Sequence, residues 1–92
     1  MFYYVYILLL QNGKFYTGSS HDLIQRIASH SAGKVISTKP YRPIKLVHYE
    51  AYLEKADALR REKYLKTTEG KYFLRQQIKV LFEKIKNKCP VV

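Results

Sequence analysis

Residues 2–20 read FYYVYILLLQNGKFYTGSS, which contains two strand-like segments on either side of a turn. Aromatic, β-branched and leucine side chains fill residues 3–10, and this composition favours a β-strand. Asn12-Gly13 is a strong hairpin signal, and residues 14–19 supply the returning strand. The sequence therefore predicts a β-hairpin at the start of the chain.

The length of the hairpin loop decides which side chains share a face of the sheet. A two-residue loop pairs Leu9 with Tyr16 and places Tyr6 on the opposite face. A three-residue loop, with Gly13 in a left-handed bulge, pairs Leu8 with Tyr16 instead. In that register Tyr6 and Tyr16 are diagonal neighbours on one face. If the two tyrosines share a site, the loop must be the bulged one.

The period of the apolar residues then changes from strand-like to helical. Ser19 or Ser20 is expected to cap the next helix, and a loop over residues 34–43 is expected to cover or feed a site. The predicted elements are a hairpin from residues 3–10 and 14–19, a helix near 21–31, a strand near 44–52 and helices near 54–66 and 70–87. Their order is β-β-α-β-α-α, with residues 44–52 joining the hairpin in one sheet.

Size and charge limit the function classes. Ninety-two residues make one small domain, residues 1–92, with a single core. Seventeen Lys and Arg against seven Asp and Glu give a net charge of +10. This charge points to a polyanionic partner, with nucleic acid ahead of an anionic membrane surface. Lysines that merely keep the protein soluble are the alternative explanation.

Cysteine usage and hydropathy indicate the compartment. Cys89 is the one cysteine, so neither an intrachain disulfide nor a cysteine metal site can form. The longest apolar run, Phe2 to Leu10, is too short to span a bilayer and lacks the basic start of a signal peptide. We expect a soluble, cytoplasmic protein with no membrane partner.

Glu62 is a carboxylate inside the apolar arc of a predicted helix. Its neighbours three and four positions away include Ala58, Leu59 and Leu65. A lone buried carboxylate is costly unless a cation or hydrogen bonds compensate it. Two interpretations stay open: a salt bridge to Lys66 or to an arginine, or a ligand for Mg²⁺, which tolerates one protein carboxylate with waters and substrate phosphate.

Arg26 and His30 lie four residues apart and share one face of a predicted helix. The planar fork of Arg26 could clamp a phosphate, and His30 could hydrogen-bond an attacking water or orient a neighbour. Such a pair alone is typical of a solvated helix face. A tyrosine that acts as a base, Tyr6 or Tyr16, needs its pKa lowered by cations such as Arg26 or a metal. Gly18 would allow close approach of backbone or phosphate.

In their order along the chain, these residues resemble the GIY-YIG endonuclease superfamily over about residues 3–66. Tyr6 matches the tyrosine that ends the first motif, and Tyr16 and Gly18 match the two ends of the second. Arg26 and His30 match the helical arginine and histidine of the family, and Glu62 matches its metal-binding glutamate. Two positions depart from the name motif, since Tyr4 replaces its first glycine and Thr17 the middle residue of the second triplet. Neither position supplies a catalytic group.

The resemblance implies an α+β fold with a three-stranded antiparallel sheet flanked by helices. It also implies a nuclease that hydrolyses nucleic-acid phosphodiester bonds with Mg²⁺ or Mn²⁺, but it does not imply a particular substrate. We expect DNA rather than RNA. Members act in repair, recombination, restriction and mobile elements, so DNA repair is one expected role. The implied site has Tyr6, Tyr16, Arg26, His30 and Glu62 as catalytic residues, Glu62 as the metal ligand and Gly18 in support.

Two other functions stay open beside the nuclease. One is a basic nucleic-acid-binding module without turnover, which uses Lys and Arg for phosphates and tyrosines for stacking. The other is a basic protein that docks on a partner, or dimerises, through the C-terminal helix at about residues 70–87. An intact set of catalytic residue types favours the nuclease over the binding module, since binding alone does not need a carboxylate among basic residues.

Overall fold

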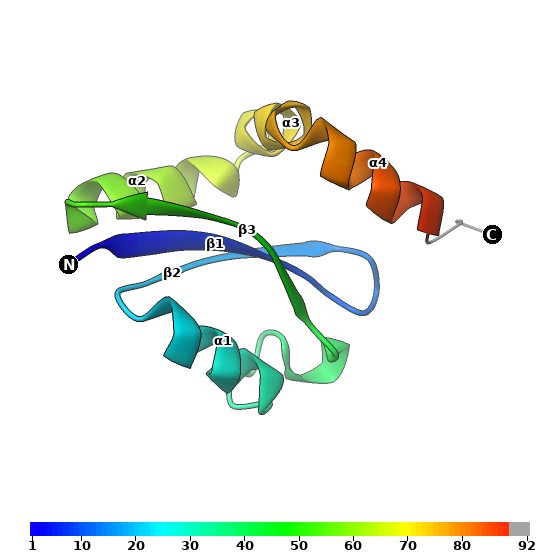
Figure 1. Ribbon diagram of the computed structural model, residues 1–92, viewed down its shortest axis with the longest axis horizontal. Helices are drawn as coiled ribbons and strands as arrows, with labels where there is room; N and C mark the ends of the chain where they lie inside the picture. The colour runs from blue at the N-terminus through cyan, green and yellow to red at the C-terminus, as the bar shows by residue number, and fades with distance from the viewer. Residues whose placement is uncertain (89–92) are drawn as a thin grey trace. The chain divides into compact units, whose positions relative to one another are not determined.

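The computed structural model describes residues 1–88, and Cys89 lies outside them. The chain divides into two compact units, residues 1–62 and a second unit that begins at Lys63. The elements, labelled in Figure 1, are β1 (Tyr3–Leu9), β2 (Phe15–Ser20), α1 (Leu23–Ser31), the short 3-10 helix η1 (Lys39–Tyr41), β3 (Lys45–Tyr52), α2 (Lys55–Leu65), α3 (Thr68–Gln77) and α4 (Lys79–Lys88). The predicted α+β fold is confirmed. Among the described residues, none of the helices is long and apolar enough to cross a membrane.

A three-stranded antiparallel sheet of order β2-β1-β3 forms the frame of the first unit. The predicted strand near residues 44–52 pairs with β1 and joins the hairpin in one sheet, as expected. The middle strand β1 contributes the most deeply buried side chains, from Val5 to Leu8, none of them more than 1% exposed. A central strand covered on both faces explains why this segment is continuously apolar rather than alternating.

The hairpin has the bulged three-residue loop. The Leu10 amide bonds the Lys14 carbonyl at 2.9 Å, and the Gly13 amide bonds the Leu10 carbonyl at 2.9 Å. Gly13 has a φ of +82°, the left-handed conformation that the bulge requires. Leu8 therefore lies opposite Tyr16, and the predicted register is confirmed.

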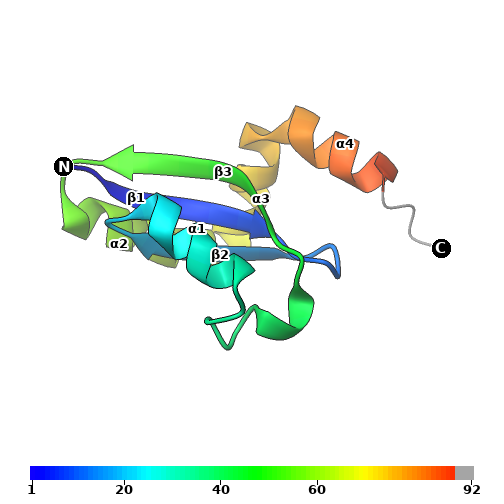
Figure 2. The ribbon, with the colours of Figure 1, turned by 60° about the horizontal axis from the view of Figure 1, so that its bottom comes forward.

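Two adjacent rows of paired residues point to opposite faces of the sheet. The first row consists of Gly18, Tyr6 and Tyr49, and the second consists of Ser19, Val5 and Glu50. Within the first unit, α1 lies along the face of the first row and α2 along the face of the second, which Figures 1 and 2 show from two directions. Everything on the α1 face is thus separated from α2 by one layer of sheet.

Helix α1 is capped by Asp22, whose Oδ1 accepts the Gln25 amide at 3.1 Å. The expected serine cap was wrong because β2 extends to Ser20, whose hydroxyl instead accepts the Asp22 amide at 3.1 Å. The buried side of α1 is not simply the side that carries its apolar residues. His30 is fully buried, whereas the apolar Ile24 is 85% exposed.

The single helix predicted at residues 70–87 is two helices, so the chain ends with three helices rather than two. Thr67 caps α3 by accepting the Gly70 amide at 3.0 Å. The backbone then leaves helical geometry at Ile78, with φ −112° and ψ 40°, before α4 begins. No proline or glycine marks the break, and the apolar spacing of Leu74, Ile78 and Leu81 continues across it. The sequence pattern was therefore that of one helix.

Candidate active site

Four of the five predicted catalytic side chains meet on the α1 face. The Tyr6 hydroxyl lies 2.8 Å from Nε2 of His30, and Arg26 donates from Nε to the same hydroxyl at 3.3 Å. The Tyr16 ring packs edge-on against the His30 ring, with centroids 5.3 Å apart. The bulged register makes this possible, because it places both tyrosines under one helix.

Gly18 makes room for the Tyr6 phenol. The two residues lie directly opposite each other across the β1–β2 pair. A Cβ added at Gly18 would overlap the hydroxyl and the Cζ atom of Tyr6. The space that was expected to admit backbone or phosphate is therefore filled by the protein's own phenol, and any side chain at Gly18 would displace it.

Thr38 joins the site from the loop between α1 and β3. Its Oγ1 lies 2.8 Å from Nδ1 of His30, and both side chains are fully buried. The same loop is tied back to the hairpin by a 2.9 Å bond between the Gln11 amide and the Tyr41 carbonyl. The sequence predicted a loop over the site but missed Thr38, because nothing distinguishes it from the other hydroxyl residues of that loop.

We assign the tautomer of His30 from the hydrogen bonds around it. The Val35 carbonyl can only accept, so the Thr38 hydroxyl donates to it at 3.5 Å and accepts from Nδ1–H of His30. Nε2 then carries the lone pair and accepts from the Tyr6 hydroxyl. The Tyr6 oxygen in turn accepts from Arg26. We call Arg26, Tyr6, His30 and Thr38 the relay cluster.

Burial sets the protonation states in the relay cluster. It raises the pKa of Tyr6 above 10.0, although the Arg26 guanidinium acts in the opposite direction. Burial also lowers the pKa of His30 below 6.5, and the nearby Arg26 charge lowers it further. Arg26 lowers the pKa of this tyrosine as expected of a nearby cation, but burial outweighs it. At neutral pH a neutral phenol and a neutral imidazole lie beside a permanent cation.

Glu62, the fifth predicted residue, approaches β2 from the other face of the sheet. Its Oε1 accepts a 2.6 Å hydrogen bond from Ser19, which follows Gly18 on this edge strand. After burial, the charge of Glu62 is among the smaller effects that raise the pKa of Tyr6. Glu62 is thus across the edge strand from the relay cluster rather than within it. Ser19 was missed because its partner lies 43 positions away in sequence.

The donor atoms beside Glu62 suit a hard divalent cation. A carboxylate and a hydroxyl are oxygen ligands, and Mg²⁺ is commonly held by one or two carboxylates together with waters and phosphate oxygens. Within residues 1–88, no group of three or more His, Cys, Asp or Glu side chains is placed to hold a metal ion. Glu62 therefore fits a cation that takes most of its ligands from water and substrate.

A second polar cluster lies on the α2 face around Glu50. Its carboxylate accepts from the Tyr52 hydroxyl at 2.7 Å, from Nε of Arg61 at 2.9 Å and from Nε2 of His48 at 3.0 Å. The hydrogen bond from His48, followed by those from Arg61 and Tyr52, lowers the pKa of Glu50 from 4.5 to about 2 against the effect of burial. Burial and the bond to Glu50 raise the pKa of Tyr52 to about 12. We call Glu50, Arg61, His48 and Tyr52 the anchor cluster.

Comparison with known proteins decides the family. A family model described as the GIY-YIG catalytic domain matches residues 2–77, which is most of the chain. The chain belongs to the GIY-YIG family. Among GIY-YIG relatives, a UPF0213 protein of Staphylococcus epidermidis is 38% identical over 82 residues, which cover 88% of this chain and 95% of the relative. A UPF0213 protein of Staphylococcus haemolyticus is 42% identical over 76 residues, which cover 82% of this chain and 87% of the relative.

A solved structure is also similar to this GIY-YIG chain. The solution NMR structure of a UPF0213 protein from Bacillus halodurans shares 34% sequence identity and a TM-score of 0.56 with it. The match covers 85% of this chain and 86% of the other. The sequence and fold likenesses therefore both extend over most of the chain, and family membership gives the chain a nuclease-family role.

Proposed function

We propose that this protein is an endonuclease that hydrolyses phosphodiester bonds of nucleic acid, DNA in preference to RNA, with Mg²⁺ or Mn²⁺. The observation that carries the proposal is the position of Arg26. Within the described residues its guanidinium has a phenol as partner and no carboxylate. Arg61, on the other face, is paired with Glu50. A substrate phosphate would supply the anion that Arg26 lacks.

The overall charge supports a polyanionic substrate. The net charge of +10 includes nine Lys and Arg against five Asp and Glu in residues 1–62 alone. Phosphate neutralisation by such a surface releases counterions, so we expect nucleic-acid affinity to fall steeply with added salt. The charge draws the backbone to the protein but gives little sequence preference, because phosphate contacts carry no base information.

Arg26 would bind the scissile phosphate through its exposed Nη nitrogens while Nε keeps its bond to Tyr6. A hollow of about 230 Å³ beside it is lined by Arg26, Ser20, His21, Asp22, Gln25 and Ser29, which gives a phosphate access to the guanidinium. The planar fork matches phosphate oxygens. Its positive charge is worth most when negative charge builds up on the phosphate in the transition state.

Tyr6 and His30 would together remove the proton of the attacking water. Tyr6 is fully buried in the free protein, so the attacking water would have to enter beside Arg26; as the Tyr6 oxygen takes a proton from that water, its own proton passes to Nε2 of His30 over the 2.8 Å hydrogen bond. This sequence of transfers does not need a free phenolate at neutral pH, which the raised pKa of Tyr6 disfavours. The lowered pKa of His30 keeps its imidazole neutral and able to accept. Tyr16, which packs on His30 and is partly exposed, is the alternative residue to contact the water.

Glu62 would hold the divalent cation, and Ser19 would orient the carboxylate through its 2.6 Å hydrogen bond. A bound divalent cation supplies charge stabilisation at the phosphate and leaving oxygen. It also adds a positive charge near Tyr6, which favours loss of the phenol proton. Ser19, the partner of Glu62 on β2, follows Gly18, and the Tyr6 hydroxyl lies against Gly18 on the opposite face of that strand.

The test is cleavage of a substrate panel with Mg²⁺, with Mn²⁺ and with chelator. The panel contains branched, flapped, single-stranded and double-stranded DNA, with RNA counterparts. We expect metal-dependent cleavage by the wild type and its loss in Glu62→Gln, with binding unchanged or slightly tighter because a negative charge is removed. Glu83→Gln, the same change at an exposed position of α4, should cleave normally.

Two outcomes would contradict the proposal, one against the endonuclease activity and one against the metal ligand. If the wild type binds nucleic acid but cleaves nothing in the panel with either metal, the endonuclease assignment is wrong and the binding module takes its place. If the wild type cleaves and Glu62→Gln cleaves equally well, the assignment of Glu62 as metal ligand is wrong.

A further inference from the structure

An exposed aromatic ring lies next to the relay cluster on the α1 face. Tyr49 of β3 is paired directly with Tyr6, and its side chain is 54% exposed. Tyr4 packs against Tyr49 edge-on, with ring centroids 6.0 Å apart and planes at 64°. The two rings therefore form an angled pair of walls rather than a closed stack.

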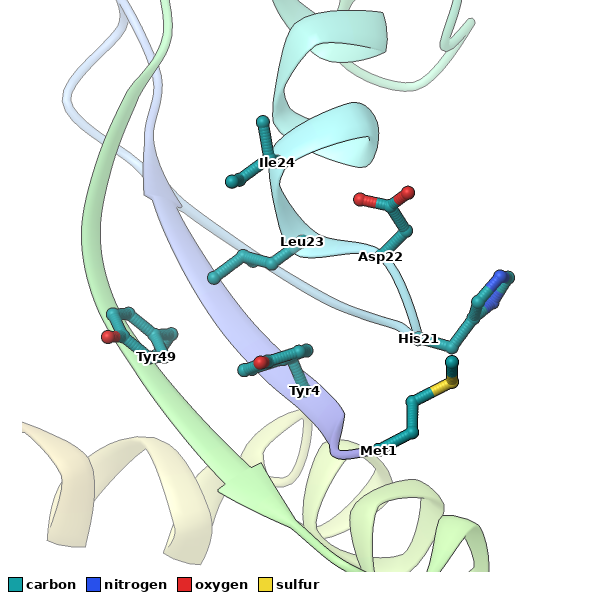
Figure 3. A pocket seen from close by; sticks show the side chains of 7 residues that line it. All are labelled: Met1, Tyr4, His21, Asp22, Leu23, Ile24 and Tyr49. Carbon is teal, nitrogen blue, oxygen red and sulfur yellow. The ribbon is translucent and has the colours of Figure 1, made fainter.

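Helix α1 completes a hollow over these two rings. Leu23 and Ile24 project from its first turn, and in Figure 3 the side chain of Leu23 points toward the two tyrosines. The hollow has a volume of about 390 Å³, and His21 and Asp22 form its polar border. Ile24 is 85% exposed, so the apolar wall is open to solvent.

This hollow adjoins the one that contains Arg26. His21 and Asp22, at the start of α1, line both of them. A nucleic-acid strand whose phosphate lies on Arg26 would thus have a neighbouring base within reach of the tyrosine pair. We propose that the hollow lined by Tyr4, Tyr49 and Leu23 binds one unpaired nucleobase of the substrate strand. This inference rests on the proposed function.

Charge and shape both favour a base in this hollow. The Arg26 guanidinium lines only the neighbouring hollow and gives the phosphate a cation there, whereas the tyrosine hollow has two aromatic rings and Leu23, with Asp22 at its border as an acceptor for an exocyclic amino group. Tyrosine rings stack on the π-face of any base, which makes the contact tolerant of sequence. A base inside a duplex already has both faces stacked, so only an unpaired base can enter. The expected substrates are therefore single strands, flaps and frayed ends.

The test compares Tyr49→Ala with Tyr49→Phe in equilibrium binding, read by fluorescence anisotropy of labelled DNA in chelator so that nothing is cleaved. The probes are a single-stranded oligonucleotide, the same strand with abasic sites, and a blunt duplex of the same sequence. We expect Tyr49→Ala to bind the single strand roughly tenfold more weakly than the wild type. Tyr49→Phe keeps the ring and should bind normally. Abasic sites and the duplex should each abolish the difference between wild type and Tyr49→Ala.

Tyr72→Ala is the matched control, because Tyr72 of α3 is exposed to a similar extent, 57%. It should bind the single strand as the wild type does. If Tyr49→Ala binds the single strand as tightly as the wild type, or if Tyr72→Ala weakens binding equally, the hollow is not a base site and the proposed nuclease function stands. If the wild type binds none of the probes, both the base site and the nucleic-acid function are wrong.

Discussion

The two faces of the sheet carry clusters made of nearly the same side chains. Each combines a tyrosine, a histidine and an arginine: Tyr6, His30 and Arg26 in the relay cluster, and Tyr52, His48 and Arg61 in the anchor cluster. The anchor cluster surrounds a carboxylate, and the relay cluster surrounds a phenol oxygen. The anchor cluster therefore contains its own negative charge, whereas the Arg26 cation of the relay cluster has no carboxylate partner among the described residues.

The pKa shifts in the two clusters have different physical causes. The pKa of Glu50 falls to about 2 because three donors compensate its charge, so the group is held in one state. The pKa values of Tyr6 and His30 shift because both groups are buried, and both stay neutral and joined by one hydrogen bond. The contacts of Glu50 thus compensate a charge, whereas Tyr6 and His30 form a buried neutral pair that has no charge to compensate.

The anchor cluster also helps to explain the position of Glu62. Arg61 and Glu62 are consecutive on α2, and they bond residues on opposite strands of the sheet, Glu50 on β3 and Ser19 on β2. Both of these strand residues are paired with Val5. The Arg61–Glu50 and Glu62–Ser19 contacts lie on either side of Val5, and together they fix the rotation of α2 about its axis. The Arg61–Glu50 ion pair therefore helps to hold the Glu62 carboxylate at the edge strand β2.

The largest expected effect is a difference in cleavage rate between variants of Arg26 and Arg61. Arg26→Ala should reduce the rate of cleavage by about 100- to 1,000-fold, because it removes charge stabilisation of the transition state. Its cost in unfolding free energy should stay below about 1 kcal/mol, since the side chain is exposed. Arg61→Ala should show the reverse, with a loss of stability and a much smaller loss of rate. Single-turnover cleavage and urea unfolding of both variants measure this, and equal rate losses would contradict the division of roles.

The next effect concerns stability at Glu50. Glu50→Ala should lower the free energy of unfolding by about 2–3 kcal/mol, because it leaves Arg61 and His48 without their anion in a half-buried place. Urea unfolding measures the change, with Glu83→Ala as an exposed control that should cost about 0.5 kcal/mol or less. A cost at Glu50 as small as that of the control would show that the cluster does not anchor α2.

The same residue should produce a distinct step in the dependence of stability on pH. A pKa lowered from 4.5 to about 2 contributes stability that is complete above pH 4.5 and lost as the pH falls toward 2. His30, with its pKa lowered below 6.5, adds an earlier loss, because below that pH the unfolded chain takes up its proton first. Glu50→Gln should remove the lower step and keep the upper one. Urea midpoints across this pH range measure both steps, and loss of the upper step in Glu50→Gln would contradict the assignment.

The smallest effect is expected at Thr38. Thr38→Val keeps the shape but removes the acceptor for Nδ1–H of His30, so the tautomer that accepts from Tyr6 loses its support. Cleavage should fall about tenfold, and nitrogen NMR shifts of His30 should report a change of tautomer. Thr38→Ser keeps the hydroxyl and should retain both rate and tautomer. An unchanged His30 spectrum in Thr38→Val would contradict the hydrogen-bond direction inferred here.

The parts of this molecule that follow from local chemistry were predictable from the sequence. The Asn12-Gly13 pair predicted the hairpin, and the twofold alternation of a strand meant that Tyr6 and Tyr16 could share a face only with the bulged loop, which the structure has. The spacing of four residues placed Arg26 and His30 on the same side of α1. These outcomes depend on dihedral preferences and periodicity, which the order of residues along the chain determines directly.

The parts that depend on contacts between distant segments were not predictable. A hydroxyl has no sequence signal for its partner, so the bonds of Thr38 to His30 and of Ser19 to Glu62 were missed. The raised pKa of Tyr6 could not be predicted either, because it depends on burial as well as on the nearby arginine. The anchor cluster around Glu50 was missed for the same reason, since α2 and β3 supply its members from separate parts of the chain.

The two tyrosines give the most direct test of the contrast between the clusters. Tyr6→Phe and Tyr52→Phe each remove one buried or half-buried hydroxyl and keep the ring, so cleavage rate and urea stability can be compared like for like. We predict that Tyr6→Phe lowers the metal-dependent cleavage rate by at least about 100-fold, which is within the range expected when a general acid–base group is lost. Tyr52→Phe should cleave at close to the wild-type rate and lose about 1 kcal/mol of unfolding free energy. If Tyr6→Phe cleaves as fast as Tyr52→Phe, the relay cluster does not carry the chemistry.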